Sequence, residues 1–241
     1  MTVPSPPRIL PSGDAALTVE FGRDIDPQAN RRVLALDRAF AREKIEGVRE
    51  TVPTYRSLLV HYDPVMIGFD ELSKRVLSIA GLETADPSKG RRWRVPVVYG
   101  GDYGADLDAV ARVHDISTDE LIARHAGGDY LVAMIGFTPG FAYLSGLDPS
   151  IATPRRPSPR AQTPAGTISI GGVQACVQCL AAPSGWHLLG RTPVRTFHPR
   201  RDPVFLMEPG DAVTFEAIKA SEFERLDRAA EHGEQVAELI A

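Results

Sequence analysis

Two arginines lie on turns whose backbone direction is fixed by proline or glycine, and both could bind an anion. Arg155 follows a Thr-Pro pair, and Arg191 follows a glycine and precedes another Thr-Pro pair. A guanidinium held on a rigid turn offers paired donors to a carboxylate or a phosphate. The alternative is an arginine that bonds to nearby carbonyl groups, and we favour that structural role for Arg156 and Arg160.

The stretch 135–149 is the second feature with chemical potential. It reads Ile-Gly-Phe-Thr-Pro-Gly-Phe-Ala-Tyr-Leu-Ser-Gly-Leu-Asp-Pro, so glycines and prolines alternate with aromatic residues. Glycine permits positive φ and proline fixes φ, which predicts a shaped loop rather than a regular element. Phe137, Phe141 and Tyr143 would then form the wall of a small-molecule pocket. The alternative is a turn whose aromatic side chains cap the core.

The common self-contained catalytic motifs are absent from this sequence. It has no Gly-x-x-x-x-Gly-Lys-Ser/Thr loop, no Gly-x-Ser-x-Gly elbow and no His-Glu-x-x-His pair. The candidates for proton transfer are His125, His187, His198 and Asp148, each without a visible partner. The catalytic residues therefore stay unknown at this stage, and the chain is expected to need other subunits.

Cys176 and Cys179 have the C-x-x-C spacing of a redox pair. In a strand, however, residues three apart point to opposite faces, whereas a redox pair needs both sulfur atoms together at a helix start. We interpret the spacing as coincidence. His187 and His198 do not stand at zinc-ligand spacing from these cysteines, so no metal site is expected.

Composition limits the classes of partner. The 241 residues carry a net charge of -4 with a pI near 5.9, which argues against a mainly electrostatic binder of nucleic acid or of membrane surfaces. We see no apolar run of membrane-spanning length and no signal-peptide pattern at the start. Two cysteines form no disulfide framework, which agrees with a reducing compartment. We expect a globular, cytoplasmic protein.

Periodicity and capping residues in the first hundred residues predict alternating strands and helices. The expected elements are a strand over 16–21, a helix opened by Asp26 and ended by Gly47, strands over 48–52 and 56–62, a helix over 69–80 and a strand over 93–99. This order is that of a ferredoxin-like split βαβ unit, with 93–99 as its fourth strand. The polar segment 83–90 or the residues just after Tyr99 mark the domain boundary.

The second half is dominated by short apolar segments between Gly/Pro turns. Two short helices come first, over 105–113 and 118–125, and the second opens with a capping box at Ser117. The spacing of the segments that follow predicts a closed or nearly closed β-barrel. The expected strands are 130–135, 167–170, 173–180, 187–189, 194–197, 204–207 and 212–215.

A last amphipathic helix is expected from Ser221, again with a capping-box pattern. It would pack on the barrel or on a partner, and we favour the barrel because most amphipathic helices bury their apolar stripe internally. The predicted domains are residues 1–92, residues 93–219 and a C-terminal helix over 220–241.

Seven short stretches, spread from about Leu10 to Phe215, together resemble one family: the KipI and PxpB group, also called allophanate hydrolase subunit 1 or the first carboxyltransferase subdomain. The resemblance implies an α+β protein with a ferredoxin-like N-terminal domain followed by a cyclophilin-like β-barrel domain, in agreement with the patterns above. The matching stretches are Gly13-Asp14-Ala15-Ala16-Leu17, Pro53-Thr54-Tyr55-Arg56-Ser57-Leu58, the run from Gly136 to Leu144, Thr153-Pro154-Arg155-Arg156, Pro164-Ala165-Gly166, the run from Gly185-Trp186 to Gly190-Arg191-Thr192-Pro193, and Pro209-Gly210-Asp211.

The resemblance implies a subunit of an ATP-dependent 5-oxoprolinase that opens 5-oxoproline to L-glutamate with PxpA-like and PxpC-like partners and is inactive alone. ATP with Mg²⁺ is then expected at the level of the complex, with none of it firmly assigned to this chain. Two alternatives stay open. Similar proteins include an inhibitor of a sensor histidine kinase and a carboxyltransferase or allophanate hydrolase subunit of urea metabolism.

We also predict that Arg155 and Arg191 line one pocket with the loop from Phe137 to Tyr143 at the barrel mouth, because Pro or Gly fixes the backbone beside both arginines and the loop supplies apolar walls. The sequence departs from the family pattern after Gln174: Ala-Cys-Val-Gln-Cys stands where Thr-Gly-Ile-Tyr-Pro is usual, and Ser184 replaces a usual glycine. The missing tyrosine leaves open either a different substrate or a repacked wall. The expected substrate-binding residues are Phe137, Pro139, Gly140, Phe141, Tyr143, Arg155, Gln174, Trp186 and Arg191.

Overall fold

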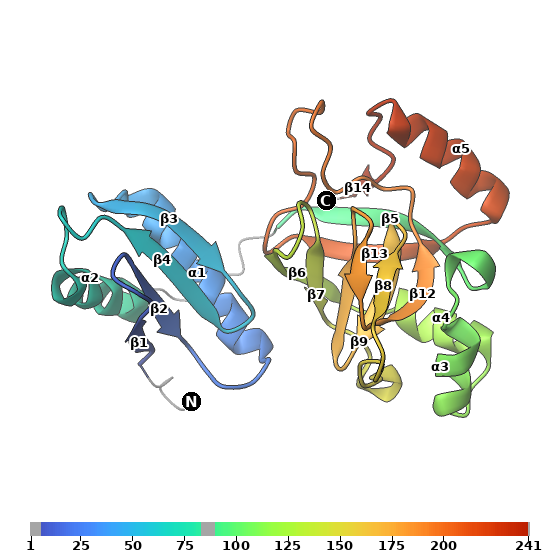
Figure 1. Cartoon of the computed structure of the whole chain (residues 1–241), viewed down its shortest axis with the longest axis horizontal. Helices are drawn as coiled ribbons and strands as arrows, with labels where there is room; N and C mark the ends of the chain where they lie inside the picture. The colour runs from blue at the N-terminus through green and yellow to red at the C-terminus, as the bar shows by residue number, and fades with distance from the viewer. Residues whose placement is uncertain (1–5, 83–89, 241) are drawn as a thin grey trace. The chain divides into compact units, whose positions relative to one another are not determined.

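The computed structural model describes residues 6–82 and 90–240, which form two compact units, 1–88 and 89–241 (Figure 1). Each unit has its own apolar core. The α+β class predicted from the sequence is confirmed. None of the helices in these ranges is both long and apolar enough to cross a membrane.

The first unit is a four-stranded antiparallel sheet with two helices, in the strand order β1-β2-β4-β3. The N-cap predicted at Asp26 is confirmed, because its side chain accepts a hydrogen bond from Gln28 N. The first helix ends earlier than predicted, at Glu43, and Lys44 directly after it adopts the left-handed conformation. The elements are β1 (Arg8–Pro11), β2 (Ala16–Glu20), α1 (Pro27–Glu43), β3 (Val48–Pro53), β4 (Ser57–Tyr62) and α2 (Phe69–Leu82).

The fourth strand of this sheet is not the one predicted. The segment expected there forms β5 (Arg92–Tyr99), and β5 belongs to the barrel. The free edge of β2 is taken instead by β1, whose Arg8 lies opposite Glu20 and forms an ion pair with it. Val95 and Val97 of β5 are fully buried in the barrel core, so burial of these valines explains why the strand joins the second sheet.

The second unit is a seven-stranded mixed barrel, as the strand spacing predicts. Its strands follow the order β12-β9-β10-β7-β6-β13-β5, and a pairing of β12 with β5 closes the ring. The β13–β5 pair is parallel and the other neighbours are antiparallel. The barrel strands besides β5 are β6 (Tyr130–Ile135), β7 (Ala142–Ser145), β9 (Thr167–Gly171), β10 (Gln174–Val177), β12 (His187–Arg191) and β13 (Ala212–Ala217).

Two segments predicted as barrel strands, 194–197 and 204–207, are irregular. Only a single bridge, between Phe197 and Phe205, joins them. Backbone hydrogen bonds such as that from His198 N to Val204 O join the two segments to each other. Neither segment is a strand of the barrel sheet, so together they form a side loop. Among the strands that the sequence pattern did not predict are β7 and the small pair β8 (Arg160–Thr163) and β11 (Ala182–Ser184), which are short.

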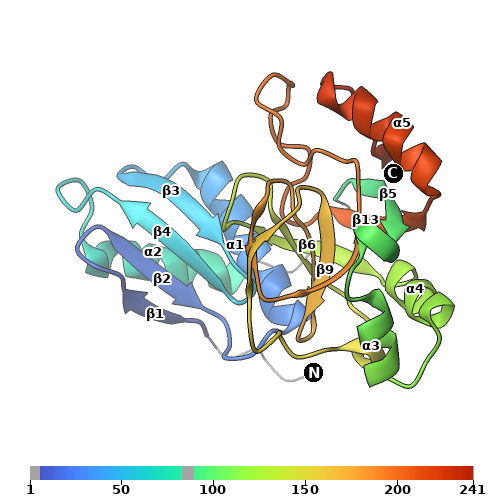
Figure 2. The ribbon, with the colours of Figure 1, turned by 45° about the vertical axis from the view of Figure 1, so that its right-hand side comes forward.

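Helices close and cover the barrel. Figures 1 and 2 both show α3 (Leu107–Val113) and α4 (Thr118–Ala126) side by side at one end, and Leu107 and Leu121 enter the barrel core. The cap predicted at Ser117 is confirmed by its bond from Glu120 N. The last helix, α5 (Ala220–Glu231), contacts β5, and β14 (Glu238–Leu239) also pairs with β5.

The packing of α5 on the barrel was the alternative favoured from the sequence, and the structure confirms it. Phe223 of α5 is buried and its ring contacts Tyr103 at 4.9 Å between centroids. The predicted capping box is wrong, because the helix begins at Ala220 and Ser221 lies inside its first turn. Lys219 occupies the N-cap position without a side-chain cap.

Candidate functional site

A short loop connects β6 to β7 and carries the first predicted site residues. Three backbone hydrogen bonds hold it: Gly136 N to Phe141 O at 3.1 Å, Phe141 N to Thr138 O at 3.0 Å and Thr138 N to Gly136 O at 2.8 Å. The last of these bonds spans only three residues, so Phe137 is the centre of a γ-turn. Its φ is 67°, a conformation that phenylalanine rarely adopts. The shaped loop predicted from glycine and proline content is therefore present.

Gly140 locks this loop onto the segment around Phe197. Its φ is 72°, and a Cβ placed on it would lie 2.6 Å from Phe197 Cβ and 2.9 Å from Thr196 Oγ1. Thr196 Oγ1 also donates a hydrogen bond to Gly140 O at 2.5 Å. Gly140 and the exposed Pro139 thus shape the loop through the backbone, with no side-chain donor or acceptor to offer a ligand.

Four aromatic residues form one continuous row, which we call the aromatic row: Phe137, Phe141, Tyr143 and Trp186. Successive ring centroids are 5.6 Å, 4.5 Å and 6.0 Å apart. Phe141 and Trp186 are buried, Tyr143 is half-buried, and Phe137 is exposed. The sequence stretch from 137 to 143 is thereby joined to a residue more than forty positions later.

The aromatic row lies on the face of the barrel sheet that points away from the core. Ala142 and Leu144 of β7 enter the barrel core, so Tyr143 between them faces outward. Directly beside Tyr143, on β10, lies Cys176, which neighbours Ser169 of β9. Burial raises the pKa of the Cys176 thiol to about 12, so this cysteine is a packing residue and not a thiolate nucleophile at neutral pH.

Trp186 packs flat against a glycine on β9. A Cβ at Gly171 would lie 2.7 Å from the indole ring, so this position excludes every larger residue unless the ring moves. Gln174 is paired with Gly171 across the β9–β10 hairpin and is half-buried. Because Gln174 and Cys176 are two residues apart on one strand, they lie on the same outward face, which puts Gln174 beside the row.

Arg155 lies at the Trp186 end of the row. Its guanidinium carbon is 5.5 Å from the centroid of the indole ring, within the range of a cation–π contact. Burial raises the pKa of Tyr143, the nearby Cys176 raises it further, and the positive charge of Arg155 opposes both, so Arg155 also acts on the phenol group. Among the described residues, no carboxylate forms an ion pair with Arg155, and its side chain is exposed. Its donors are therefore available to an anion.

Arg156 and Arg160 have a structural role, as favoured from the sequence, but their partner is a carboxylate rather than the carbonyl groups expected. Arg156 Nη1 donates to Asp106 Oδ1 at 3.1 Å, and Arg160 Nη1 and Nη2 donate to the two Asp106 oxygens at 2.9 and 2.8 Å. Leu188 N adds a fourth bond at 2.8 Å. Burial alone would raise the pKa of Asp106, but the hydrogen bonds from Arg160 and Leu188 N and the charges of both arginines lower it below its ordinary value.

Asp106 is thus a positioning residue that sequence reasoning missed. It ties the loop carrying Arg155 to β12, which follows Trp186. Its only visible signal was its position before the helix that begins at Leu107, and in the structure its side chain does not cap that helix. Its arginine partners are 50 and 54 residues away in the sequence, and no local pattern reveals such a distance.

Arg191, the other predicted anion-binding arginine, lies away from the row. Its Nε donates to Ala165 O at 3.1 Å, and its guanidinium carbon lies 5.3 Å from the ring centroid of Phe223 in α5. Trp186 directly precedes β12 and Arg191 is its last residue, so the rise of a strand separates them by about 15 Å. The structure therefore brings Arg155 together with the aromatic loop and leaves Arg191 outside this cluster.

His125 is a core residue rather than a proton-transfer group. It is fully buried, stacks on Phe215 with 4.9 Å between ring centroids, and its Nδ1 lies 2.8 Å from Tyr99 Oη. Burial lowers the pKa of His125 to about 3, so the ring is neutral at physiological pH. Its ring neighbours are core residues and not members of the aromatic row.

Of the remaining proton-transfer candidates, His187 and Asp148 make structural hydrogen bonds, and His198 lies outside the aromatic row. His187 Nε2 lies 2.8 Å from Pro154 O, which helps to hold the loop that carries Arg155. Asp148 accepts a bond from Ser150 N at 2.8 Å and caps a short 3₁₀ turn. His198 lies in the side loop after residue 197. Catalytic residues therefore stay unassigned.

The two cysteines contact different partners. Cys176 Sγ is 3.1 Å from Ser169 Oγ, whereas Cys179 Sγ accepts a hydrogen bond from Phe197 N at 3.3 Å. Both are free and buried, in agreement with the interpretation of their spacing as coincidence. Within residues 6–82 and 90–240, no group of three His, Cys, Asp or Glu side chains could hold a metal ion.

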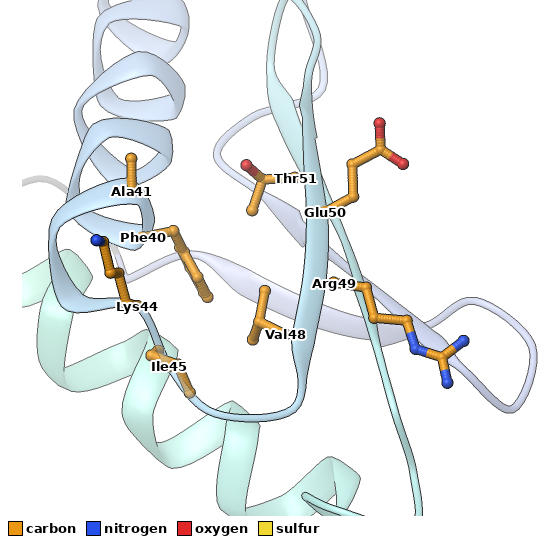
Figure 3. Close-up of a pocket in the computed structure, with 8 residues that line it drawn as sticks. All are labelled: Phe40, Ala41, Lys44, Ile45, Val48, Arg49, Glu50 and Thr51. Atoms are coloured by element: carbon orange, nitrogen blue, oxygen red, sulfur yellow. The ribbon is translucent and has the colours of Figure 1, made fainter.

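The first unit has a separate surface pocket of about 300 Å³ between the end of α1 and β3 (Figure 3). Val48 and Thr51 point from β3 toward α1, while Arg49 and Glu50 point away from the helix. Arg49 is engaged by Asp63 at 2.7 Å. No predicted site residue lies here, and the inward groups offer apolar contact without an arrangement for a reaction. The lining residues are Phe40, Ala41, Lys44, Ile45, Val48, Arg49, Glu50 and Thr51.

Comparison with known proteins gives a consistent result for the chain. The family model for the carboxyltransferase domain, subdomain C and D, matches residues 7–207. A 5-oxoprolinase subunit of Bacillus subtilis (strain 168) is 35% identical over 222 residues, which cover 88% of this chain and 92% of that protein. The corresponding protein of Escherichia coli O157:H7 is 34% identical over 204 residues.

Solved structures support the fold. The crystal structure of TTHA0988 matches 85% of this chain with a TM-score of 0.76 and 33% identity, yet this chain spans only 40% of that longer chain. The Kluyveromyces lactis urea carboxylase matches 99% of this chain with a TM-score of 0.79. At 21% identity over 24% of its own chain, that second likeness concerns the fold alone.

Proposed function

This chain belongs to the carboxyltransferase-domain family of subdomains C and D, and we propose that it is a subunit of an ATP-dependent 5-oxoprolinase. That enzyme would open the lactam of 5-oxoproline to L-glutamate, together with PxpA-like and PxpC-like partners. The proposal is supported by the 35% identity to the Bacillus subtilis 5-oxoprolinase subunit over 92% of that relative. Two free buried cysteines and the use of ATP fit a cytoplasmic protein.

The observation that carries the site assignment is Arg155. An exposed guanidinium stacked on Trp186, without an ion-pair partner among the described residues, matches the single carboxylate of 5-oxoproline. The half-buried Tyr143 ring offers apolar surface to the lactam ring, and the buried Trp186 ring under Arg155 excludes water from one side of the ion pair. Gln174, on the same face, can donate to or accept from the lactam amide.

The chemistry explains why this chain would not act alone. A lactam carbonyl is a poor electrophile, and ATP would supply activation by phosphorylation of its oxygen. Within the described residues, no carboxylate or histidine cluster fits a Mg²⁺ site, so we assign the nucleotide to no residue here. The contribution of this chain is to bind and orient the substrate anion through Arg155.

The test is to reconstitute the complex with its PxpA-like and PxpC-like partners and to follow glutamate release from 5-oxoproline and ATP. Arg155→Ala is expected to raise KM by about 10- to 100-fold, which corresponds to about 1.5–3 kcal/mol for a hydrogen bond to a charged group. Its melting temperature should stay that of the wild type, because the side chain is exposed.

Arg160→Ala is the matched control. It removes an arginine from the same loop, but one that neutralises the buried Asp106, so it should lower the melting temperature. No glutamate from the reconstituted wild-type complex would reject the proposed reaction. An Arg155→Ala complex with normal KM would reject the assigned anion site and leave the reaction standing.

A further inference from the structure

Phe137 combines an unfavourable backbone conformation with an exposed side chain, and neither feature stabilises the chain by itself. It stands at the centre of the γ-turn with φ of 67°, and 64% of its surface is exposed. The turn with positive φ is the strained form, rarely occupied by a residue with a side chain. The Phe137 ring packs edge-on against the ring of Phe141. The fold therefore presents an aromatic ring to solvent at a cost in backbone energy.

The next residue adds a second unfavourable feature. Thr138 Oγ1 is buried, and no hydrogen-bond partner for it exists among the described residues. Buried hydroxyl groups are nearly always bonded, so an unpartnered one marks a place where something else contributes a partner or the loop rearranges. Backbone strain at Phe137 and a buried hydroxyl without a hydrogen-bond partner at Thr138 thus occur side by side in one loop.

The substrate proposed for Arg155 does not need this end of the aromatic row. Arg155 stacks on Trp186, and two further rings, Tyr143 and Phe141, come between Trp186 and Phe137. A lactam is about as wide as one aromatic ring, so a molecule held by Arg155 beside the half-buried Tyr143 ring leaves Phe137 uncovered. The exposed end of the row is thus free for a larger occupant.

The site at Arg155 is also incomplete in this chain. His187 is engaged by Pro154 O, the Cys176 thiol is protonated, and we find no other acid or base of the described residues that faces the row. In TTHA0988, sequence like this chain makes up 40% of one longer polypeptide, so there a further segment is covalently attached to the same fold. Such a segment is a physical candidate to supply the missing groups.

We propose that Phe137 is the anchor by which this chain docks a second protein of the complex, the PxpC-like partner, beside the Arg155 site. The partner would receive the ring in an apolar pocket and offer a hydrogen-bond group to Thr138. Exposed aromatic anchors of this kind dominate the affinity of interfaces, because their apolar area is buried at little cost in side-chain entropy. This inference rests on the proposed function for the identity of the partner.

The experiment uses calorimetry to measure the dissociation constant between the full-length chain and the purified PxpC-like partner, together with the melting temperature of each variant. Phe137→Gly should weaken binding at least tenfold while melting no lower than the wild type, since glycine accepts a φ of 67° without strain. Phe137→Ala should bind as weakly but melt below Phe137→Gly, because it keeps the strained Cβ.

The control is Val65→Ser, which removes an apolar side chain that is 93% exposed in the first unit. It should bind like the wild type. A Phe137→Gly chain that binds its partner normally overturns the inference, and so does a wild-type pair that forms no complex.

Two further outcomes separate this inference from the proposed function. If Phe137→Gly leaves the affinity between the two proteins unchanged but raises KM, the ring faces the substrate and the docking role is wrong. If the wild-type proteins associate through Phe137 but release no glutamate, the docking role stands and the 5-oxoprolinase assignment fails.

Discussion

Arginines on one loop have opposite roles because of one carboxylate. Asp106 takes up the donors of Arg156 and Arg160, while Arg155, the adjacent residue, turns to Trp186 and stays free of an ion pair among the described residues. A bound carboxylate satisfies the guanidinium plane through paired donors, so neighbouring arginines are not equivalent. Because Asp106 pairs with Arg156 and Arg160 and not with Arg155, Arg155 is the arginine of this loop that can bind an anion.

A buried histidine makes stability depend on pH. The pKa of His125 falls from 6.5 to about 3 on folding because burial disfavours its charged form. Between pH 6.5 and about pH 3, His125 is therefore protonated in the unfolded chain and neutral in the folded chain. The free energy of unfolding should fall by about 1.4 kcal/mol per pH unit as pH drops below 6.5, and this loss should stop near pH 3.

Denaturant unfolding at about pH 7.0, 5.5 and 4.0, which are equal steps across the His125 window, measures that slope. His125→Asn, which keeps an acceptor for Tyr99 Oη, should be less stable at pH 7 but nearly flat over this range. The carboxyl of Asp106 also loses its stabilising charge on acidification, but at lower pH, since its pKa lies below its ordinary value of 3.8. An unchanged slope in the variant would contradict the assignment to His125.

Among the elements, the hairpin of β6 and β7 depends on a glycine for its attachment to the rest of the barrel. Gly140→Ala would force a methyl group to within 2.6 Å of Phe197 in a backbone with φ of 72°. We expect a loss of about 3 kcal/mol, because overpacking and backbone strain each contribute. Urea unfolding followed by circular dichroism measures it.

Gly172→Ala is the matched control in the same unit. Gly172 also has a positive φ, 63°, but nothing lies within 4 Å of an added Cβ. Only strain remains, so the expected loss is about 1 kcal/mol. Equal losses in the two variants would show that contact with Phe197 does not matter to the position of the loop.

At the scale of the whole molecule, the predicted binding residues all lie in the second unit. The barrel core and the core of the first unit share no residue, so each can exclude water independently. We expect residues 89–241 to fold as a fragment with a cooperative thermal transition and to bind 5-oxoproline with the affinity of the full-length chain.

Calorimetric melting and ligand titration of this fragment test that expectation. Removing residues 1–88 leaves the bonds of the buried Asp211 intact, because its carboxylate accepts hydrogen bonds from Arg91 and from the Trp93 indole. A fragment that melts without cooperativity, or that binds only when the first unit is added back, would show that the units depend on each other.

Local chemistry in the sequence determined much of this protein. The spacing of short apolar segments between Gly/Pro turns predicted the barrel, Asp26 and Ser117 predicted two helix starts, and the glycines and prolines of 136–149 predicted the shaped loop. These features depend on residues close together in the chain, so the sequence carries them directly. Family resemblance rests on the same short stretches.

Tertiary structure alone decided which distant residues meet. The strand 92–99 suits either sheet by its pattern, and burial of its valines with β13 placed it in the barrel. Arg155 and Arg191 look alike in sequence, yet Trp186 and Asp106 select the first, while α5 covers the second. Asp106 meets arginines that lie 50 and 54 residues away in the sequence. Such contacts depend on sheet register and on which residues are buried together, and a local sequence pattern reveals neither.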